Sequence, residues 1–174
     1  DIRMSSNTFT PTDIRDSLAG KLTDYCIDKL KKLPENHDKV EFNIFMTAYS
    51  FDFNDRLNEL LANGFDEEEI TIIRNSFLTL TNDIINEKNI KIKDELQKAK
   101  SLNKKRREIQ SSDISIEFKI IKILEDCKEF GTLPFSILAR FGFVGAILMK
   151  SLVKKNVISQ NDLDLFMGSI KTIA

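Results

Sequence analysis

The feature that most constrains this chain is the stretch 126–141, where small and polar residues precede a long apolar run. Gly131 suits a helix C terminus that needs a positive φ angle. Thr132 suits the N-cap of a following helix, and Pro134 fits the first turn of that helix. Free backbone N–H groups at such a helix start attract an anion. The sequence therefore predicts a break between two helices at 131–134, with an anion-binding helix start beyond it.

The run 134–153 beyond this break is nearly all apolar and carries one arginine, Arg140. A charge in such surroundings is expected to be paired, or reserved for a carboxylate or phosphate. The run is about long enough to span a bilayer, but glycine, serine and charged residues interrupt it. We therefore expect the buried central helix of a protein without a membrane partner. Gly142 and Gly145 are expected to let a neighbouring helix approach closely.

Helices are predicted along the rest of the chain, because glycine (6) and proline (3) are scarce among its 174 residues and apolar residues recur at three- and four-residue steps. The predicted fold is all-α, a single irregular bundle of about seven helices around the helix at about 134–153. The expected helical segments are 12–32, 38–49, 52–63, 66–86, 87–110, 114–130, 134–154 and 159–172.

Local signals support several of these boundaries. Asp38-x-x-Glu41 and Asp66-x-x-Glu69 both resemble capping boxes, Gly64 suits a helix stop, and Ser159 suits an N-cap. The segment 38–50 is ambiguous between helix and strand, because its apolar residues also alternate as those of a strand do.

Composition and charge exclude several classes of function. The formal net charge of −1 gives no general attraction to nucleic acid or membrane. A basic cluster at 98–107 lacks interleaved aromatic residues, so it is interpreted as a solvated helix face and no nucleic-acid partner is expected. Cys26 and Cys127 are the only cysteines. This usage is typical of a reducing compartment, and a cytoplasmic location is expected.

Motifs for catalysis or metal binding are missing from the sequence. It contains no glycine-rich phosphate loop, no HExxH motif and no Ser-His-Asp pattern. His37, the only histidine, precedes an expected helix start, where a capping or solvated role is common. No second cysteine or histidine stands at metal-ligand spacing from Cys127. We therefore expect neither a catalytic residue nor a metal site within this chain.

Arg3, Glu41 and Arg140 are the polar residues with two open interpretations. Arg140 and Glu41 can form an internal ion pair that joins two helices. Alternatively, the three residues can line a pocket for an amino acid. An arginine would then hold the α-carboxylate by its fork, and an acidic residue would hold the ammonium group.

Short sequence pieces along nearly the whole chain carry a resemblance to a known family. In order they are Asp1-Ile2-Arg3, Ser6-Asn7 before Phe9 and Pro11, His37-Asp38-Lys39-Val40-Glu41-Phe42, Thr47, Tyr49, Asp52-Phe53, Arg56-Leu57, Gly64-Phe65, Leu80-Thr81-Asn82, Glu125-Asp126-Cys127, Gly131-Thr132-Leu133-Pro134-Phe135 and Leu138-Ala139-Arg140. Their order and spacing resemble the central helical region of phosphoenolpyruvate-synthase-like proteins, and most of all the glutamine kinases of capsule (phosphoramidate) biosynthesis. Ala48 departs from the pattern, which has a cysteine between the threonine and the tyrosine.

The resemblance implies a three-part phosphotransferase. An ATP-grasp-like domain uses ATP and magnesium to phosphorylate a histidine on a separate mobile domain, which then swings to an acceptor, L-glutamine in the glutamine kinases. Both of those domains lie outside this chain. Residues 1–174 are therefore expected to be one helical domain, a fragment of the larger enzyme that is inactive when isolated and holds no cofactor.

The expected role of this domain is acceptor binding and docking. The residues expected to bind the acceptor are Arg3, Glu41, Asp126, Thr132 and Arg140. Two other interpretations stay open: a structural helical spacer between the ATP and phosphohistidine domains, and an unrelated helical interaction module. The sequence leaves the acceptor open, because glutamine, pyruvate or another small molecule would fit.

Overall fold

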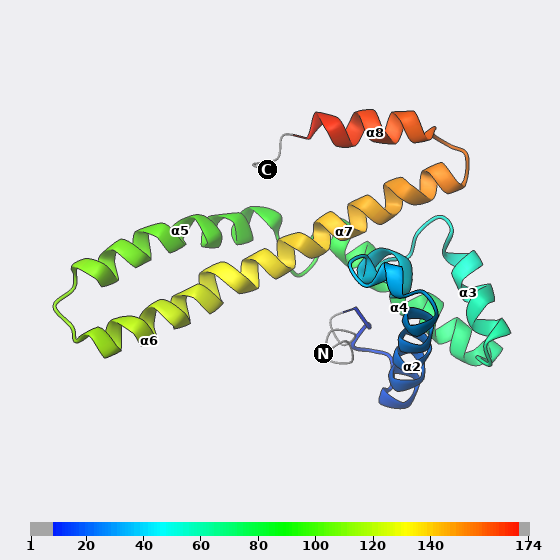
Figure 1. Cartoon of the computed structure of the whole chain (residues 1–174), viewed down its shortest axis with the longest axis horizontal. Helices are drawn as coiled ribbons and strands as arrows, with labels where there is room; N and C mark the ends of the chain where they lie inside the picture. The colour runs from blue at the N-terminus through cyan, green and yellow to red at the C-terminus, as the bar shows by residue number, and fades with distance from the viewer. Residues whose placement is uncertain (1–8, 171–174) are drawn as a thin grey trace. The chain divides into compact units, whose positions relative to one another are not determined.

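The computed structural model describes residues 9–170 (Figure 1). In this part of the chain the fold consists of seven α-helices without a β-strand, and 76% of the structure is helical, so the predicted all-α class is confirmed. The α-helices are α2 (Asp16–Lys32), α3 (Phe53–Ala62), α4 (Glu67–Ile85), α5 (Ile92–Ser111), α6 (Ile116–Asp126), α7 (Leu133–Lys154) and α8 (Gln160–Ser169). A short 3-10 helix (Pro34–Asn36) and two π-helices, η2 (Val40–Ile44) and η3 (Cys127–Thr132), complete the helical elements.

The chain divides into two compact units, and the single domain expected from the sequence stays a prediction. Unit 1 comprises Asp1–Asn82 and Phe143–Ala174, and unit 2 comprises Asp83–Gly142. The apolar core lies in unit 1. In unit 2 the buried residues are Glu95, Ile109, Asp126 and Pro134, two of which are charged. Unit 2 therefore has few buried apolar side chains and no sizeable core of its own.

Unit 1 is held together by α2, α3 and α4. Their core residues recur three or four positions apart, as expected for helices with one buried face: Leu18 and Leu22 of α2, Phe53, Leu57 and Leu60 of α3, and Ile70, Ile73 and Phe77 of α4. The predicted boundaries of α3 and α4 are confirmed. Gly64 ends the first with a φ of 89°. Asp66 and Glu69 form the predicted capping box, with each side chain accepting from the other residue's backbone N–H at 2.8 and 3.1 Å.

The ambiguous segment 38–50 is neither the predicted α-helix nor a strand. Its helical part is the five-residue π-helix η2, which begins after Lys39 without a side-chain cap, so the predicted capping box at Asp38 is wrong. From Phe45 the backbone is irregular, and its residues 45–48 are all buried. The alternation seen in the sequence therefore reflects a segment enclosed on all sides, which has no single exposed face.

The predicted break at 131–134 is also wrong, because the helix continues through it from Ile116 to Lys154 (Figure 1). Pro134 has no N–H and disrupts an α-helix. The π-helix η3 accommodates it by shifting to wider hydrogen bonds, so that the Leu133 N–H donates to the carbonyl of Lys128. Thr132 is therefore no N-cap, and its carbonyl accepts from Ser136 Oγ at 2.9 Å. No free N–H groups are left at this point for an anion.

The apolar helix α7 is less buried than its composition predicted. Its buried residues are Pro134, Val144, Ile147 and Ser151. A Cβ atom added at Gly142 or Gly145 would meet nothing within 4 Å, so the close helix approach expected there is absent from the described structure. By length and composition alone, the helical stretch Ile116–Lys154 is apolar enough to cross a membrane, with a mean hydropathy of 1.7 and 17% of its most apolar window buried. One such helix is weak evidence for a membrane span, because the core helix of a soluble protein, which is mostly buried, has the same length and composition.

The core of unit 1 predicts that alanine substitutions of a buried and of an exposed leucine differ in their effect on the free energy of unfolding. Leu60 of α3 is fully buried, and Leu165 of α8 is 66% exposed. Leu60→Ala should lower the free energy of unfolding by about 2–5 kcal/mol, because it removes buried methyl groups and leaves a cavity. Leu165→Ala should change it by less than about 0.5 kcal/mol. Urea denaturation of both variants checks this, and equal effects would contradict the core described here.

Candidate functional site

The five residues predicted to bind the acceptor are distributed over both units. Arg3 lies outside the described residues. Glu41 belongs to unit 1, and Asp126, Thr132 and Arg140 belong to unit 2. Each set is therefore described by itself.

The three predicted residues of unit 2 have structural contacts of their own. Asp126 is buried and pairs with Lys105 at 3.8 Å, and the same ammonium group lies 4.0 Å from the centre of the Phe130 ring. Thr132 sits within the continuous helix. Arg140 is half-buried and already has a partner in the described structure. Burial lowers the pKa of its guanidinium group from the ordinary value.

Glu41 belongs to a network that holds the irregular segment of unit 1. Its carbonyl accepts from Thr47 Oγ1 at 2.6 Å. The guanidinium group of Arg56 donates to the carbonyls of Phe42 at 2.9 Å and Phe45 at 3.2 Å. Because a guanidinium group presents several fixed donors, it can fasten two turns of irregular backbone at once.

These contacts explain why several sequence pieces that carry the resemblance lie together in unit 1. The pieces containing Glu41, Thr47 and Arg56 meet in this network. The Tyr49 N–H, from another piece, donates to Thr81 Oγ1 of α4 at 2.7 Å. These residues therefore support one local backbone conformation.

A small cleft lies beside this network, between α3 and the C-terminal half of α7. It has a volume of about 70 Å³, so it has room for a few water molecules but not for an amino acid. Lys154 pairs with the buried Asp52 at 2.7 Å, and Lys150 lies 4.0 Å from the centre of the Phe42 ring. These contacts attach α7 to the rest of unit 1.

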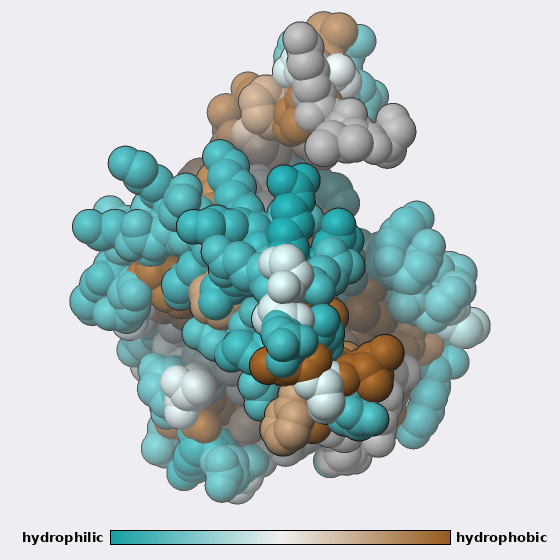
Figure 2. Space-filling view, turned by 90° about the vertical axis from the view of Figure 1, so that its left-hand side faces the viewer, coloured by the Kyte–Doolittle hydropathy of each residue, from teal (hydrophilic) through white to brown (hydrophobic). Residues whose placement is uncertain are grey.

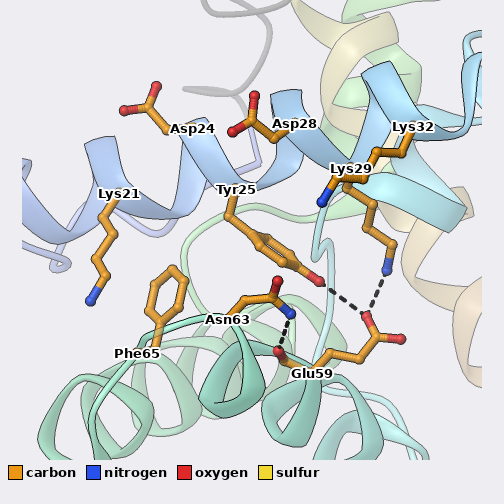
Figure 3. A pocket seen from close by; sticks show the side chains of 9 residues that line it. All are labelled: Lys21, Asp24, Tyr25, Asp28, Lys29, Lys32, Glu59, Asn63 and Phe65. Carbon is orange, nitrogen blue, oxygen red and sulfur yellow. Dashed lines mark hydrogen bonds and ion pairs between the residues drawn. The ribbon is translucent and has the colours of Figure 1, made fainter.

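A larger cleft of about 430 Å³ lies between α2 and α3, and we call it the α2–α3 cleft (Figure 3). Its volume falls within the range of small-molecule sites. Six lining residues come from α2, one from α3 and two from the turn after α3: Lys21, Asp24, Tyr25, Asp28, Lys29, Lys32, Glu59, Asn63 and Phe65. The lining contains three cationic and three anionic side chains. Such a surface is suited to a ligand that carries both charges.

Glu59 is at the centre of the polar contacts in the α2–α3 cleft. In Figure 3, Tyr25 and Lys29 extend from α2 toward it, and its Oε2 accepts from the Tyr25 hydroxyl at 3.1 Å and from Lys29 Nζ at 2.7 Å. At the other end of the cleft, Lys21 lies 4.4 Å from the centre of the Phe65 ring and donates to the carbonyl of Gly64 at 2.9 Å. These contacts fasten α2 to α3.

The contacts shift two pKa values in the cleft. Burial and the negative charge of Glu59 raise the pKa of Tyr25 to about 12. Burial alone would raise the pKa of Glu59, but the hydrogen bonds and charge supplied by Lys29, together with the Tyr25 hydroxyl, outweigh it and lower that pKa. At neutral pH Tyr25 is therefore a hydrogen-bond donor and Glu59 a carboxylate.

This chemistry supports binding more than catalysis. A tyrosine that keeps its proton is a poor general base at neutral pH. Within residues 9–170, no group of three or more metal-ligating side chains could hold a metal ion. Lys29 and Glu59 already pair with each other, so a small zwitterion can bind here only if this pair opens, with each side chain then meeting the end of the ligand that is opposite in charge.

Sequence reasoning missed the α2–α3 cleft. One signal was present: Lys21 and Lys29 stand four residues before and after Tyr25, so the three side chains share one face of the helix. Their partner Glu59 lies on another helix, and no local pattern indicates that pairing.

Comparisons with known proteins do not identify this chain. No family model, no curated protein and no solved structure matches it.

The raised pKa of Tyr25 predicts a loss of stability in alkali. As the pH rises past 10, the unfolded chain releases the phenolic proton while the folded chain keeps it until about 12. The unfolded state is therefore favoured increasingly between these values. Tyr25→Phe should flatten this part of the stability profile, as measured by urea denaturation below and above pH 10. Parallel profiles for the two proteins would contradict the Tyr25–Glu59 contact.

Proposed function

We propose that this chain is the acceptor-binding and docking domain of a cytoplasmic ATP-dependent phosphotransferase, and that the acceptor is L-glutamine, phosphorylated on its side-chain amide. In this proposal an ATP-grasp domain, with ATP and magnesium, phosphorylates a histidine on a further domain of the same protein. The phosphohistidine then delivers the phosphoryl group to the acceptor. The isolated chain contributes no catalytic residue and is inactive by itself.

The observation that carries this proposal is the α2–α3 cleft, because its size and mixed charges suit a free amino acid. Its walls are helices that contribute to the core of unit 1, so the charged groups are held by a rigid frame. The sequence resemblance adds the reaction class. The meeting of several resembling pieces in one network is consistent with a shared local fold.

In the proposed complex, Glu59 holds the α-ammonium group of glutamine, and Lys29 and Lys32 hold its α-carboxylate. These three side chains line the same cleft. Charge-assisted hydrogen bonds of this kind fix the orientation of a small ligand. The side-chain amide then extends along the cleft, where a phosphoryl donor on another domain would have to reach it.

A calorimetric titration of the chain with L-glutamine tests the proposal. Lys29→Gln and Glu59→Gln should each weaken binding by about tenfold or more, because each removes a charge-assisted contact. Lys155→Gln is the matched control: it removes the same charge from an exposed pair, with Asp55, outside the cleft. Far-UV circular dichroism of every variant verifies that the helices remain.

The outcomes separate the α2–α3 cleft from the site predicted by sequence. If Arg140→Lys weakens glutamine binding and Lys29→Gln does not, the acceptor is held near Arg140 by its guanidinium fork, as the sequence suggested. If the unchanged chain binds no glutamine, acceptor binding by this domain is contradicted.

A second candidate function, a structural spacer between the two catalytic domains, is favoured by one observation. The helix runs without interruption from Ile116 to Lys154, through a proline that would ordinarily break it. A spacer needs such continuity and needs no ligand. It predicts that variants of the α2–α3 cleft leave transfer to glutamine unchanged in the full-length enzyme.

A further inference from the structure

Positive charge gathers in the small cleft between α3 and the C-terminal half of α7, which we call the α3–α7 cleft. Its lining residues all belong to unit 1 and include Asp52, Arg56, Lys150 and Lys154. The described lining thus contains three cationic side chains and one carboxylate, which leaves a formal excess of two positive charges. A hollow lined mainly by one sign of charge concentrates ions of the opposite sign. The cleft is therefore suited to an anion.

The carboxylate of this lining, Asp52, is already balanced by contacts of its own. Lys154 Nζ lies 2.7 Å from Asp52 Oδ2, and the Ser50 hydroxyl donates to Asp52 Oδ1 at 2.6 Å. Burial alone would raise the pKa of Asp52, but these contacts outweigh it and lower that pKa, so the group stays ionised beside Lys154. Asp52 therefore balances one of the three positive charges, and those of Arg56 and Lys150 remain.

Arg56 and Lys150 have contacts that orient them without neutralising them. Arg56 donates to two backbone carbonyls, one of them that of Phe42, and Lys150 Nζ lies 4.0 Å from the centre of the Phe42 ring. In the described part of the chain, neither cation forms an ion pair with a carboxylate. Glu59, whose pKa Arg56 helps to lower, already pairs with Lys29. Both cations are thus held beside the cleft with further N–H donors to offer.

The basic residues of α5 differ from this pair, because they lie on open surface or are balanced locally. In Figure 2, which views the molecule from the side where the α5–α6 connection lies in Figure 1, hydrophilic residues cover much of the surface. Lys98 and Lys104 pair with carboxylates three and four residues away on the same helix, and Lys100 is exposed. Exposed pairs and solvated charges of this kind contribute little to binding. The α3–α7 cleft is therefore the better place for an anion.

We propose that the α3–α7 cleft binds a small tetrahedral oxyanion, of which inorganic phosphate is the simplest, between Arg56 and Lys150. The cleft has a volume of about 70 Å³, enough for a few water-sized groups and so for the oxygens of one phosphate group. The planar guanidinium group of Arg56 can donate to two of these oxygens at once. Lys150 adds an ammonium group on a flexible stem, which can follow the ion into the cleft.

The phosphate group can come from two sources, because the cleft has room for this group alone. It is either a free ion or the exposed end of a larger molecule, and the same two cations recognise it in both cases. Phosphate binding here needs no ligand in the α2–α3 cleft. It therefore goes beyond the proposed function and stands whether or not the chain binds glutamine.

NMR of the isotope-labelled whole chain, titrated with sodium phosphate at constant ionic strength, tests this binding. Signals of η2, of the start of α3 and of the C-terminal end of α7 should shift and saturate. Lys150→Gln should weaken binding by about tenfold, because it removes one of the two unbalanced charges, whereas Lys150→Arg keeps the charge and should retain most of the affinity. Lys100→Gln is the matched control, since Lys100 is also exposed and lies on α5. It should leave phosphate binding unchanged.

Asp52→Asn tests the charge balance of the cleft in the opposite direction. It removes the carboxylate of the lining and releases Lys154 for the anion, so phosphate should bind several-fold more tightly. Cations that serve only to hold the fold together would give no such gain. Far-UV circular dichroism verifies that each variant is folded, and the two Lys150 variants decide the matter if Asp52→Asn is not.

A second titration, with phenyl phosphate, separates the two sources of the phosphate group. Binding of inorganic phosphate alone assigns the cleft to the free ion. Equal or tighter binding of phenyl phosphate assigns it to the phosphate end of a larger molecule. The proposal is overturned if neither probe gives saturable shifts, or if Lys150→Gln and Lys100→Gln weaken binding equally, since the loss then reflects general charge and not this cleft.

Discussion

The packing of Phe53 into the core of unit 1 is the constraint on which the rest of that unit depends. Its ring is 1% exposed and lies 4.8 Å from the ring centre of Tyr49 and 5.5 Å from that of Phe77. It therefore links the irregular segment, α3 and α4 in one contact. Burial of Phe53, Leu57 and Leu60 turns the opposite side of α3 outward, which is where Glu59 meets α2. The α2–α3 cleft is thus a consequence of how the core orients α3.

Local sequence signals predicted the fold where one short pattern decides the conformation. Gly64 and the Asp66–Glu69 capping box end α3 and start α4 as expected, and Ser159 with Asp162 caps α8. These signals are reliable because the hydrogen bonds involved span only a few residues. The all-α class follows in the same way from the three- and four-residue spacing of apolar side chains.

The predictions failed where the conformation is decided by hydrogen bonds that the local sequence pattern does not indicate. At 131–134, glycine, threonine and proline each favour a helix boundary, but π-helical hydrogen bonds let the helix continue without the missing N–H of Pro134. At 38–50, capping and alternation suggested opposite structures. The outcome depends on Arg56, which holds the carbonyls of Phe42 and Phe45 from another helix. The α2–α3 cleft was missed for the same reason, because Glu59 and Lys29 are brought together only by the fold.

The two units differ in how many apolar side chains they bury. Unit 1 has a core of its own, which can support a cleft for a small ligand. Unit 2 buries few side chains, and one oxygen of its buried Glu95 has no hydrogen-bond partner among the described residues. Because burial of apolar side chains is the main favourable term in folding, unit 1 supplies most of that term in the described structure.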